Sequence, residues 1–378
     1  MVAGQYIGIN QKEKASKAGE QLIVFATLIS LVIMVVVYVG RGFILNVVFG
    51  SIEPAVAKHA NTYMNIVFAS IPFIAVYNSG AALFRAMGNS KITMKTSLIM
   101  NTINVVGNAI LIYGFGMGVE GAAIPTLISR AVAAIIIVLL LRDESLAIHI
   151  SKPFKYKFDS KMVRNILQIG IPNGIENSMF QLGKILLLSV VSGFGTAAIT
   201  ANAVANTVTA FQFLPGAAIG LGLVTVVSQC VGAGDYDQAR YYTKILHKYA
   251  YMALALVNGI IILASPFILK MYNLSPETAA LARKIIIFYG IHACLVWPLG
   301  FTLPNTLRAA NDVRYAMIIS VSSMWITRIG LGILFAKYLD FGMFGVWIAM
   351  ICDWYVRAAF FIHRYRGSKW EEKTAHHL

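Results

Sequence analysis

Apolar runs of about 20 residues recur along the whole chain, and they limit its possible folds more than any other feature. A helix of that length crosses about 30 Å of hydrocarbon at a rise of about 1.5 Å per residue. With 58% hydrophobic and 12% charged residues, the chain is too apolar for one soluble core. Alternation of apolar and polar residues in ten-residue segments, the pattern of a membrane β-barrel, is absent. We therefore predict an all-α integral membrane protein, whose helices satisfy their backbone hydrogen bonds within lipid.

Ten segments have the required length, and we predict ten transmembrane helices. They cover residues 20–40, 60–83, 93–114, 119–141, 166–192, 197–231, 244–265, 284–306, 315–336 and 343–363. This pattern divides the 378-residue chain into an N-terminal bundle of four helices, a cytoplasmic linker, a C-terminal bundle of six helices and a cytoplasmic tail. Their expected bounds are residues 1–141, 142–165, 166–366 and 367–378.

Basic residues concentrate on one side of the predicted membrane. When basic residues near the ends of spans are counted with the adjoining connection, 22 of the 31 Lys and Arg residues fall in alternate connections and at the two ends, six fall in the other connections, and Arg130, Lys184 and Arg328 remain inside spans. This count places Arg357 with the C-terminal end. Because cytoplasmic loops are enriched in Lys and Arg, we expect a multi-pass protein of the cytoplasmic membrane with both termini in the cytoplasm. The same placement explains the formal net charge of +15 without nucleic acid binding.

The sequence is similar to itself at a shift of 224 residues. Residues 5–8 align with 229–232, residues 118–121 with 342–345 and, after a slip of one residue, 85–91 with 308–314. Such self-similarity predicts two parallel structural repeats, as in several transporter folds. Since residues 166–228 have no counterpart before residue 5, we expect the N-terminal half to lack about 60 residues and two spans of a complete repeat.

Helix 166–192 has the largest group of polar side chains inside a predicted span. At about 100° per residue, one face of it contains Asn173, Glu176, Asn177, Gln181 and Lys184. Ionisable side chains at membrane depth are costly and usually face a bundle interior or a water-filled cavity, so we predict that this face lines a substrate or ion pathway. Two other interpretations are that Glu176 and Lys184 lie near the cytoplasmic end of the span, or that they are mutually satisfied and only hold helices together.

Helix 197–231 shows a similar stripe, formed by Asn202, Asn206 and Thr209. These groups are candidates for the same pathway, and interhelical hydrogen bonds are an equally good explanation of them. Inside other predicted spans, Arg130, Arg328 and Asp353 are candidates for a structural ion pair between helices.

No catalytic, nucleotide-binding or metal-binding motif occurs in the sequence. The glycines at 116, 118 and 121 join two apolar helices rather than a strand and a helix, so they predict a tight turn. The three cysteines lack paired spacing and are interpreted as packing residues. We therefore expect that the protein is not an enzyme and that it binds no cofactor or metal. We expect a gradient of Na⁺ or H⁺ to be its energy source.

Several segments make the chain similar to a known family. They are Gly170–Glu176, Phe213–Ala217, Val227–Gly234 and the loop sequences Phe84-Arg85-Ala86 and Leu307-Arg308-Ala309. With these segments, the chain resembles the bacterial MATE (multidrug and toxic compound extrusion) efflux transporters, from Met1 to about residue 366. The resemblance implies two facing helical bundles, alternating access, and export of amphipathic organic cations in exchange for Na⁺ or H⁺.

The chain departs from that family at its coupling acids. Trp297 stands where some members have an acidic residue, and Glu176 matches the acid of the seventh family helix only loosely. Our mechanistic hypothesis is that Glu176 alternates between a coupling cation and substrate. We expect a monomer in the lipid bilayer that binds small organic cations.

Two rival functions remain open. One is a flippase for lipid-linked or polyprenyl-phosphate precursors, because Lys184, Arg130 and Arg328 would suit an anionic head group. The other is a truncated membrane fragment without transport activity.

Overall fold

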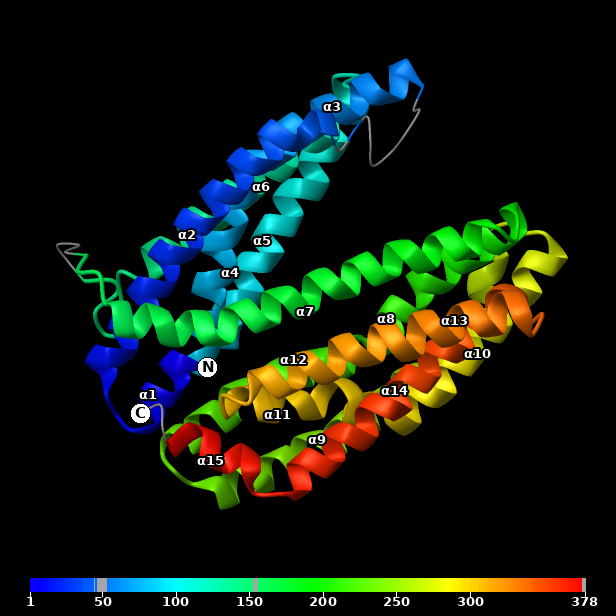
Figure 1. The fold of residues 1–378 in the computed structure, drawn as a ribbon. Coiled ribbons are helices and arrows are strands. Elements are labelled where there is room, and N and C mark those ends of the chain that lie inside the picture. The colour runs from blue at the N-terminus through cyan, green and yellow to red at the C-terminus, as the bar shows by residue number, and fades with distance from the viewer. Residues whose placement is uncertain (44, 46–52, 152–155, 376–378) are drawn as a thin grey trace. The chain divides into compact units, whose positions relative to one another are not determined.

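The computed structural model describes residues 1–43, 45, 53–151 and 156–375, and Figure 1 shows their fold. These residues form two compact units, Val2–Ile166 and Leu167–Leu378. Helices make up almost all of both units, and the described part of the chain contains no strand. The predicted all-α class is therefore confirmed.

The first unit is a bundle of four long helical segments. Its elements are α1 (Val2–Gly8), α2 (Lys12–Phe43), α3 (Pro54–Phe68), α4 (Ile71–Ala86), α5 (Ser90–Ala109), the π-helix η2 (Ile110–Gly114) and α6 (Val119–Leu140). Helix α4 packs between α2 and α6, and α5 packs on α6. Leu83, Phe84 and Ile137 form the buried centre of this bundle.

The second unit contains the remaining helices. They are α7 (Ser160–Ser192), which begins in the first unit, α8 (Thr196–Gly232), α9 (Tyr236–Lys270), α10 (Pro276–Trp297), η3 (Pro298–Thr302), α11 (Leu303–Ala309), α12 (Val313–Ser322), η4 (Ser323–Gly330), α13 (Leu331–Ile333), η5 (Leu334–Tyr338), α14 (Gly342–Arg366) and α15 (Lys369–Ala375). Helices α8, α9 and α10 pack on one another, and α14 packs on α10, η4 and η5. Their shared core includes Leu254, Ile286, Met324 and Trp347.

Hydrogen bonds tie the segment predicted as a linker to the start of α2. The Glu20 carboxylate accepts from the backbone N–H and the hydroxyl of Ser151 at 2.9 and 2.8 Å. The amide of Gln21 donates to the carbonyl of Lys157 at 2.7 Å. The described residues of this segment therefore pack against the first unit instead of spanning open space.

Asp159 caps α7 and pairs with α2. Its carboxylate accepts from the backbone N–H of Met162 at 3.0 Å and lies 2.8 Å from the Lys17 ammonium. The hydrogen bond from Lys17, followed by that from Met162, lowers the pKa of Asp159 below its ordinary value. A lowered pKa means that this stabilisation is present above the ordinary value and is lost as the pH falls through the folded-state pKa.

We therefore expect Asp159→Asn, which keeps the cap, to lower stability at pH 7 by at most about 1 kcal/mol, the scale of a solvent-screened ion pair. The difference in melting temperature between wild type and variant should close as the pH falls below 3.8, the ordinary pKa of an aspartate. A difference that is the same at acidic and neutral pH would contradict the assignment.

The two units repeat the same helix bounds at the predicted shift. Helices α2 and α9 begin at residues 12 and 236, and η2 and η5 cover 110–114 and 334–338, each pair 224 residues apart. Left-handed backbone positions repeat as well: Asn10, Gly88 and Gly116 correspond to Gly234, Asn311 and Asp340 at shifts of 223 or 224. The internal repeat is therefore a property of the backbone as well as of the sequence.

Eight helical segments are long and apolar enough to cross a membrane, and the pair α3 and α4, bent by 44°, forms a ninth if it is one span. The ten predicted segments coincide with helices over their described residues, apart from the break at residues 69–70 between α3 and α4 and from Leu141, which follows α6. Helix α7, which holds Glu176 and Lys184, is not among those eight or nine. The multi-pass membrane class is supported, and the exact number of ten spans stays a prediction.

Gly345 allows α14 to approach η5 closely. A Cβ atom at this position would lie 2.7 Å from the backbone carbon of Phe335 and 2.8 Å from the nitrogen of Ala336. The corresponding Gly121 approaches the backbone of Leu111 in the same way, at 3.3 Å. Backbone atoms cannot rotate away as a side chain can, so Gly345 serves the packing of the two segments.

Gly345→Ala is expected to destabilise the protein by about 1–3 kcal/mol, the usual cost of overpacking a core. The melting temperature in detergent should fall accordingly. Gly259→Ala is the matched control, because a Cβ there meets nothing within 4 Å and alanine favours a helix interior by up to about 1 kcal/mol. Equal melting temperatures for the two variants would contradict the close contact.

Candidate functional site

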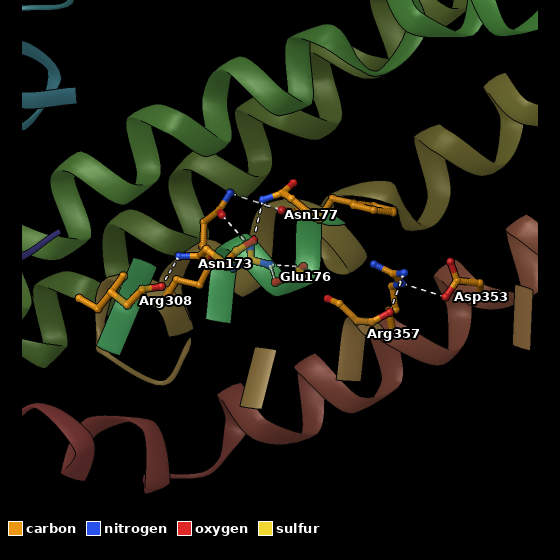
Figure 2. Close-up of polar contacts among 10 residues, drawn as sticks. Asn173, Glu176, Asn177, Arg308, Asp353 and Arg357 are labelled. Atoms are coloured by element: carbon orange, nitrogen blue, oxygen red, sulfur yellow. Dashed lines mark hydrogen bonds and ion pairs between the residues drawn. The ribbon is translucent and has the colours of Figure 1, made fainter. Parts of the chain in front are cut away.

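Glu176 is held by an arginine from another part of the second unit. Its two carboxylate oxygens accept from Nη2 of Arg308 at 2.6 and 2.9 Å, as Figure 2 shows. Nη1 of Arg308 donates to the Asn305 side chain at 3.0 Å. The two charged side chains are 15% and 14% exposed, so water reaches the pair only in part. In this conformation the Arg308 guanidinium therefore balances the negative charge of the Glu176 carboxylate.

Further along α7, small residues bring this helix against two other segments of the second unit. A Cβ on Gly183 would lie 2.3 Å from the Met324 side chain, and the Leu187 side chain would lie 3.2 Å from a Cβ on Gly332. Helix α7 thus packs against η4 and α13 on the side of these small residues. This contact determines which face of α7 points into the second unit.

Asn173 and Asn177 use their amide N–H groups within α7. Asn173 donates to the carbonyl of Ile169 at 3.0 Å, and Asn177 donates to the carbonyl of Asn173 at 2.8 Å. The side-chain oxygens of both asparagines have no donor within the described ranges, so both remain available as ligands.

Gln181 and Lys184 lie further along α7, and both are exposed. The Lys184 ammonium lies 5.0 Å from the centre of the Phe180 ring. No carboxylate contacts it among the residues that the structure describes. Glu176 and Lys184 therefore do not pair with each other, contrary to the interpretation that the two ionisable groups are mutually satisfied.

The polar stripe on α8 is mainly occupied by structural hydrogen bonds. Asn202 accepts from the indole N–H of Trp347 on α14 at 3.2 Å. Asn206 donates to the carbonyl of Asn202, and Thr209 to that of Asn206. The bond to Trp347 supports the alternative that this stripe joins helices, while exposed Asn206 is the member best placed for a pathway.

Asp353 on α14 lies between two buried arginines. Its Oδ2 lies 2.8 Å from Nη2 of Arg328, and its Oδ1 accepts from Nε of Arg357 at 2.8 Å (Figure 2). The hydroxyl of Ser323 also donates to this carboxylate, and Arg357 donates to the carbonyl of Ser320. All three charged side chains are at most 5% exposed. The triad has one net positive charge.

Three sequence predictions about charges need correction. Arg130 has no carboxylate partner in the described structure; it donates to the Ser70 hydroxyl at 2.7 Å. Arg357 lies inside α14 and belongs to the buried triad rather than to the C-terminal end. Arg308, assigned to a loop, is the partner of Glu176. The spacing of four residues between Asp353 and Arg357 was an available signal for the second of these, because such residues are neighbours on one helix face.

The described residues contain no group of three His, Cys, Asp or Glu side chains that could hold a metal ion. Cys230, Cys294 and Cys352 are free thiols at half-buried positions. Among the candidate site residues, the helices bring together the pair of Glu176 and Arg308 and the triad around Asp353; other ion pairs join Lys17 to Asp159, Arg240 to Glu371 and Arg364 to Asp312. A carboxylate with one arginine partner can exchange that partner for another cation, whereas one between two arginines is already doubly satisfied.

Comparison with known proteins identifies the family. The sequence profile of the MatE family matches residues 1–110 and 172–334. The chain is 27% identical to the transporter YisQ of Bacillus subtilis, over 99% of this chain and 82% of YisQ. It is 24% identical to the probable multidrug resistance protein NorM of Thermotoga maritima, over 86% of this chain and 71% of NorM.

Solved structures share the fold. The outward-facing structure of a multidrug resistance MATE family transporter superposes with a TM-score of 0.89 at 20% identity, over 98% of this chain and 83% of that one. A MATE structure in complex with MaL6 gives a TM-score of 0.90 at the same identity and coverage. With the family profile matching more than half of its residues, this multi-pass helical membrane protein belongs to the MatE family of transporters.

Proposed function

We propose that the chain is a secondary active efflux transporter that exports amphipathic organic cations in exchange for H⁺ or Na⁺. The observation that carries the proposal is the ion pair of Glu176 and Arg308, a partly buried carboxylate with one displaceable partner. The names of relatives, several of them probable multidrug resistance proteins, support the same class of cargo.

In the proposed cycle, Arg308, H⁺, Na⁺ and the organic cation compete for the same negative charge. Binding of H⁺ or Na⁺ to Glu176 releases Arg308, and loss of that ion leaves the carboxylate to Arg308 or to substrate. Because only one of these cations satisfies Glu176 at a time, entry of the coupling ion favours departure of the substrate. Antiport follows from this competition.

Neighbouring oxygens suit the coupling ion. Hard metal cations take oxygen ligands, and the Asn173 and Asn177 side chains present oxygens without donors in the described part of the chain. Asn173 lies three residues before Glu176, on the same side of α7. For Na⁺, these amides would share the coordination with Glu176, while a proton would need the carboxylate alone.

The triad around Asp353 is a poorer coupling site. Two arginines and the Ser323 hydroxyl already hold the carboxylate, and its side chain has no exposed surface. A cation entering there would have to displace two buried charges together. We assign the triad to stabilising the second unit.

The test is transport by the purified full chain in proteoliposomes loaded with ethidium. An imposed H⁺ or Na⁺ gradient should drive dye movement, and the gradient that works identifies the coupling ion. Liposomes without a gradient, and liposomes without protein, are the controls. Absence of gradient-dependent flux from a monodisperse preparation would refute the proposal.

We further propose that the protein acts as a monomer and that it lies in the cytoplasmic membrane with both termini in the cytoplasm; the placement of the basic residues supports this topology. A fluorescent protein fused to the C-terminus should fold and fluoresce, whereas alkaline phosphatase at the same position should be inactive. Active phosphatase would place that end outside the cytoplasm.

A further inference from the structure

Three cationic side chains surround one aromatic ring in the second unit. The Lys184 ammonium and the guanidinium carbons of Arg328 and Arg357 lie 5.0, 5.2 and 5.8 Å from the centre of the Phe180 ring. They come from α7, η4 and α14, segments far apart in the sequence. We call these four residues the Phe180 cluster.

The cluster has an excess of positive charge. Asp353 is the carboxylate that contacts it in the described structure, and Asp353 is shared by Arg328 and Arg357. Lys184 has no acceptor among the described residues. An ammonium without an acceptor next to a triad of net positive charge would favour a bound anion there.

Lys184 is the accessible member. Arg328 and Arg357 are 4% and 3% exposed, whereas Lys184 is exposed, with its ammonium over the half-buried Phe180 ring. The Nε–H of Arg328 is buried without an acceptor in the described part of the chain. The cluster thus offers an exposed ammonium, an aromatic ring within 5.0 Å of it, and a buried arginine whose Nε–H has no acceptor in the described structure.

We propose that the Phe180 cluster is a subsite for the anionic group, a phosphate or a carboxylate, of an amphiphilic substrate. The Lys184 ammonium pairs with the anion, the guanidinium groups strengthen the local positive potential, and Phe180 contacts the apolar part next to the charge. Transport of the bound amphiphile rests on the proposed function. Binding of the amphiphile at the Phe180 cluster does not depend on that function.

The subsite is separate from the pair of Glu176 and Arg308. Lys184 follows Glu176 by eight positions in α7, a rise of about 12 Å at about 1.5 Å per residue. An amphiphile with a cationic group near Glu176 and an anionic group near Lys184 would engage both. Zwitterionic and anionic amphiphiles therefore join organic cations as cargo.

The test measures binding to the purified full chain in a neutral detergent by isothermal titration calorimetry. Dodecyl phosphate and dodecyltrimethylammonium are the probes, because they share a tail and differ in the sign of the charge. Lys184→Gln is expected to lower the ratio of their affinities, phosphate over ammonium, by roughly tenfold through loss of a charge-assisted contact. Lys184→Arg should retain the wild-type ratio within about threefold.

Lys270→Gln, at the end of α9, is the matched control for removal of one lysine charge, and it should leave the ratio unchanged. An unchanged ratio in Lys184→Gln, or an equal fall in both lysine variants, would overturn the subsite. Inorganic phosphate distinguishes a free anion from a head group: if it binds as tightly as dodecyl phosphate, the proposal of an amphiphile is wrong. If only the proposed transport function is wrong, gradient-driven ethidium flux will be absent while the binding of dodecyl phosphate still depends on Lys184.

Discussion

Asp353→Asn is expected to lower the free energy of unfolding by about 3–5 kcal/mol, the cost of breaking a buried ion pair. The substitution keeps the size of the side chain but leaves Arg328 and Arg357 buried without a counter-charge. The fraction of protein that stays monodisperse after heating in detergent measures the effect, and the midpoint should fall steeply against wild type.

Asp340→Asn is the matched control, because Asp340 is exposed and its left-handed backbone suits asparagine equally well. A double variant, Asp353→Asn with Arg328→Met, removes one of the stranded charges and should recover part of the loss. If the free energy of unfolding of Asp353→Asn lies within about 1 kcal/mol of the wild-type value, the triad contributes far less to stability than a buried ion pair usually does.

Glu176→Gln is expected to reduce gradient-driven efflux of ethidium by roughly tenfold or more, a factor equivalent to at least about 1.4 kcal/mol. The amide can neither take up a proton nor balance Na⁺ or an organic cation, so the step that exchanges cations is lost. Flux should also become insensitive to the imposed gradient, because coupling and substrate binding fail together. Proteoliposome flux at matched protein density is the measurement.

Two comparisons separate coupling from stability in this variant. Glu120→Gln, at the start of α6 in the other unit, removes an acid of the same type and should retain gradient-driven flux. Glu176→Arg combined with Arg308→Glu restores a pair of opposite charges, so it should recover thermal stability while efflux stays low. Full gradient-driven flux in Glu176→Gln would remove this carboxylate from the mechanism.

Much of the helical architecture could be predicted from the sequence. The lengths of the apolar runs locate all ten helical segments, and the shift of 224 residues predicts the matching starts of α2 and α9. Helical periodicity also places Glu176 and Lys184 on the polar face of α7. These properties depend on residues that are close together in the chain, so local sequence is sufficient to predict them.

The partners of the charged groups could not be predicted in the same way. Periodicity indicates which face of α7 is polar, but not which segment packs against it. Arg308 follows Glu176 by 132 residues, and the sequence alone predicts that it lies in a loop. Only the folded bundle brings the two side chains together. Likewise, Arg130 resembles Arg328 in sequence, yet Arg130 lies beside Ser70 and Arg328 beside Asp353.

The sequence by itself therefore determined the membrane class, the repeat and the positions of the helices, because apolar length and periodicity act within each helix. Only the tertiary structure decided which charges neutralise one another and which, like Lys184, lack an acceptor in the described residues. That outcome depends on close packing between helices distant in the chain, such as Gly183 against Met324, which brings α7 and η4 into contact.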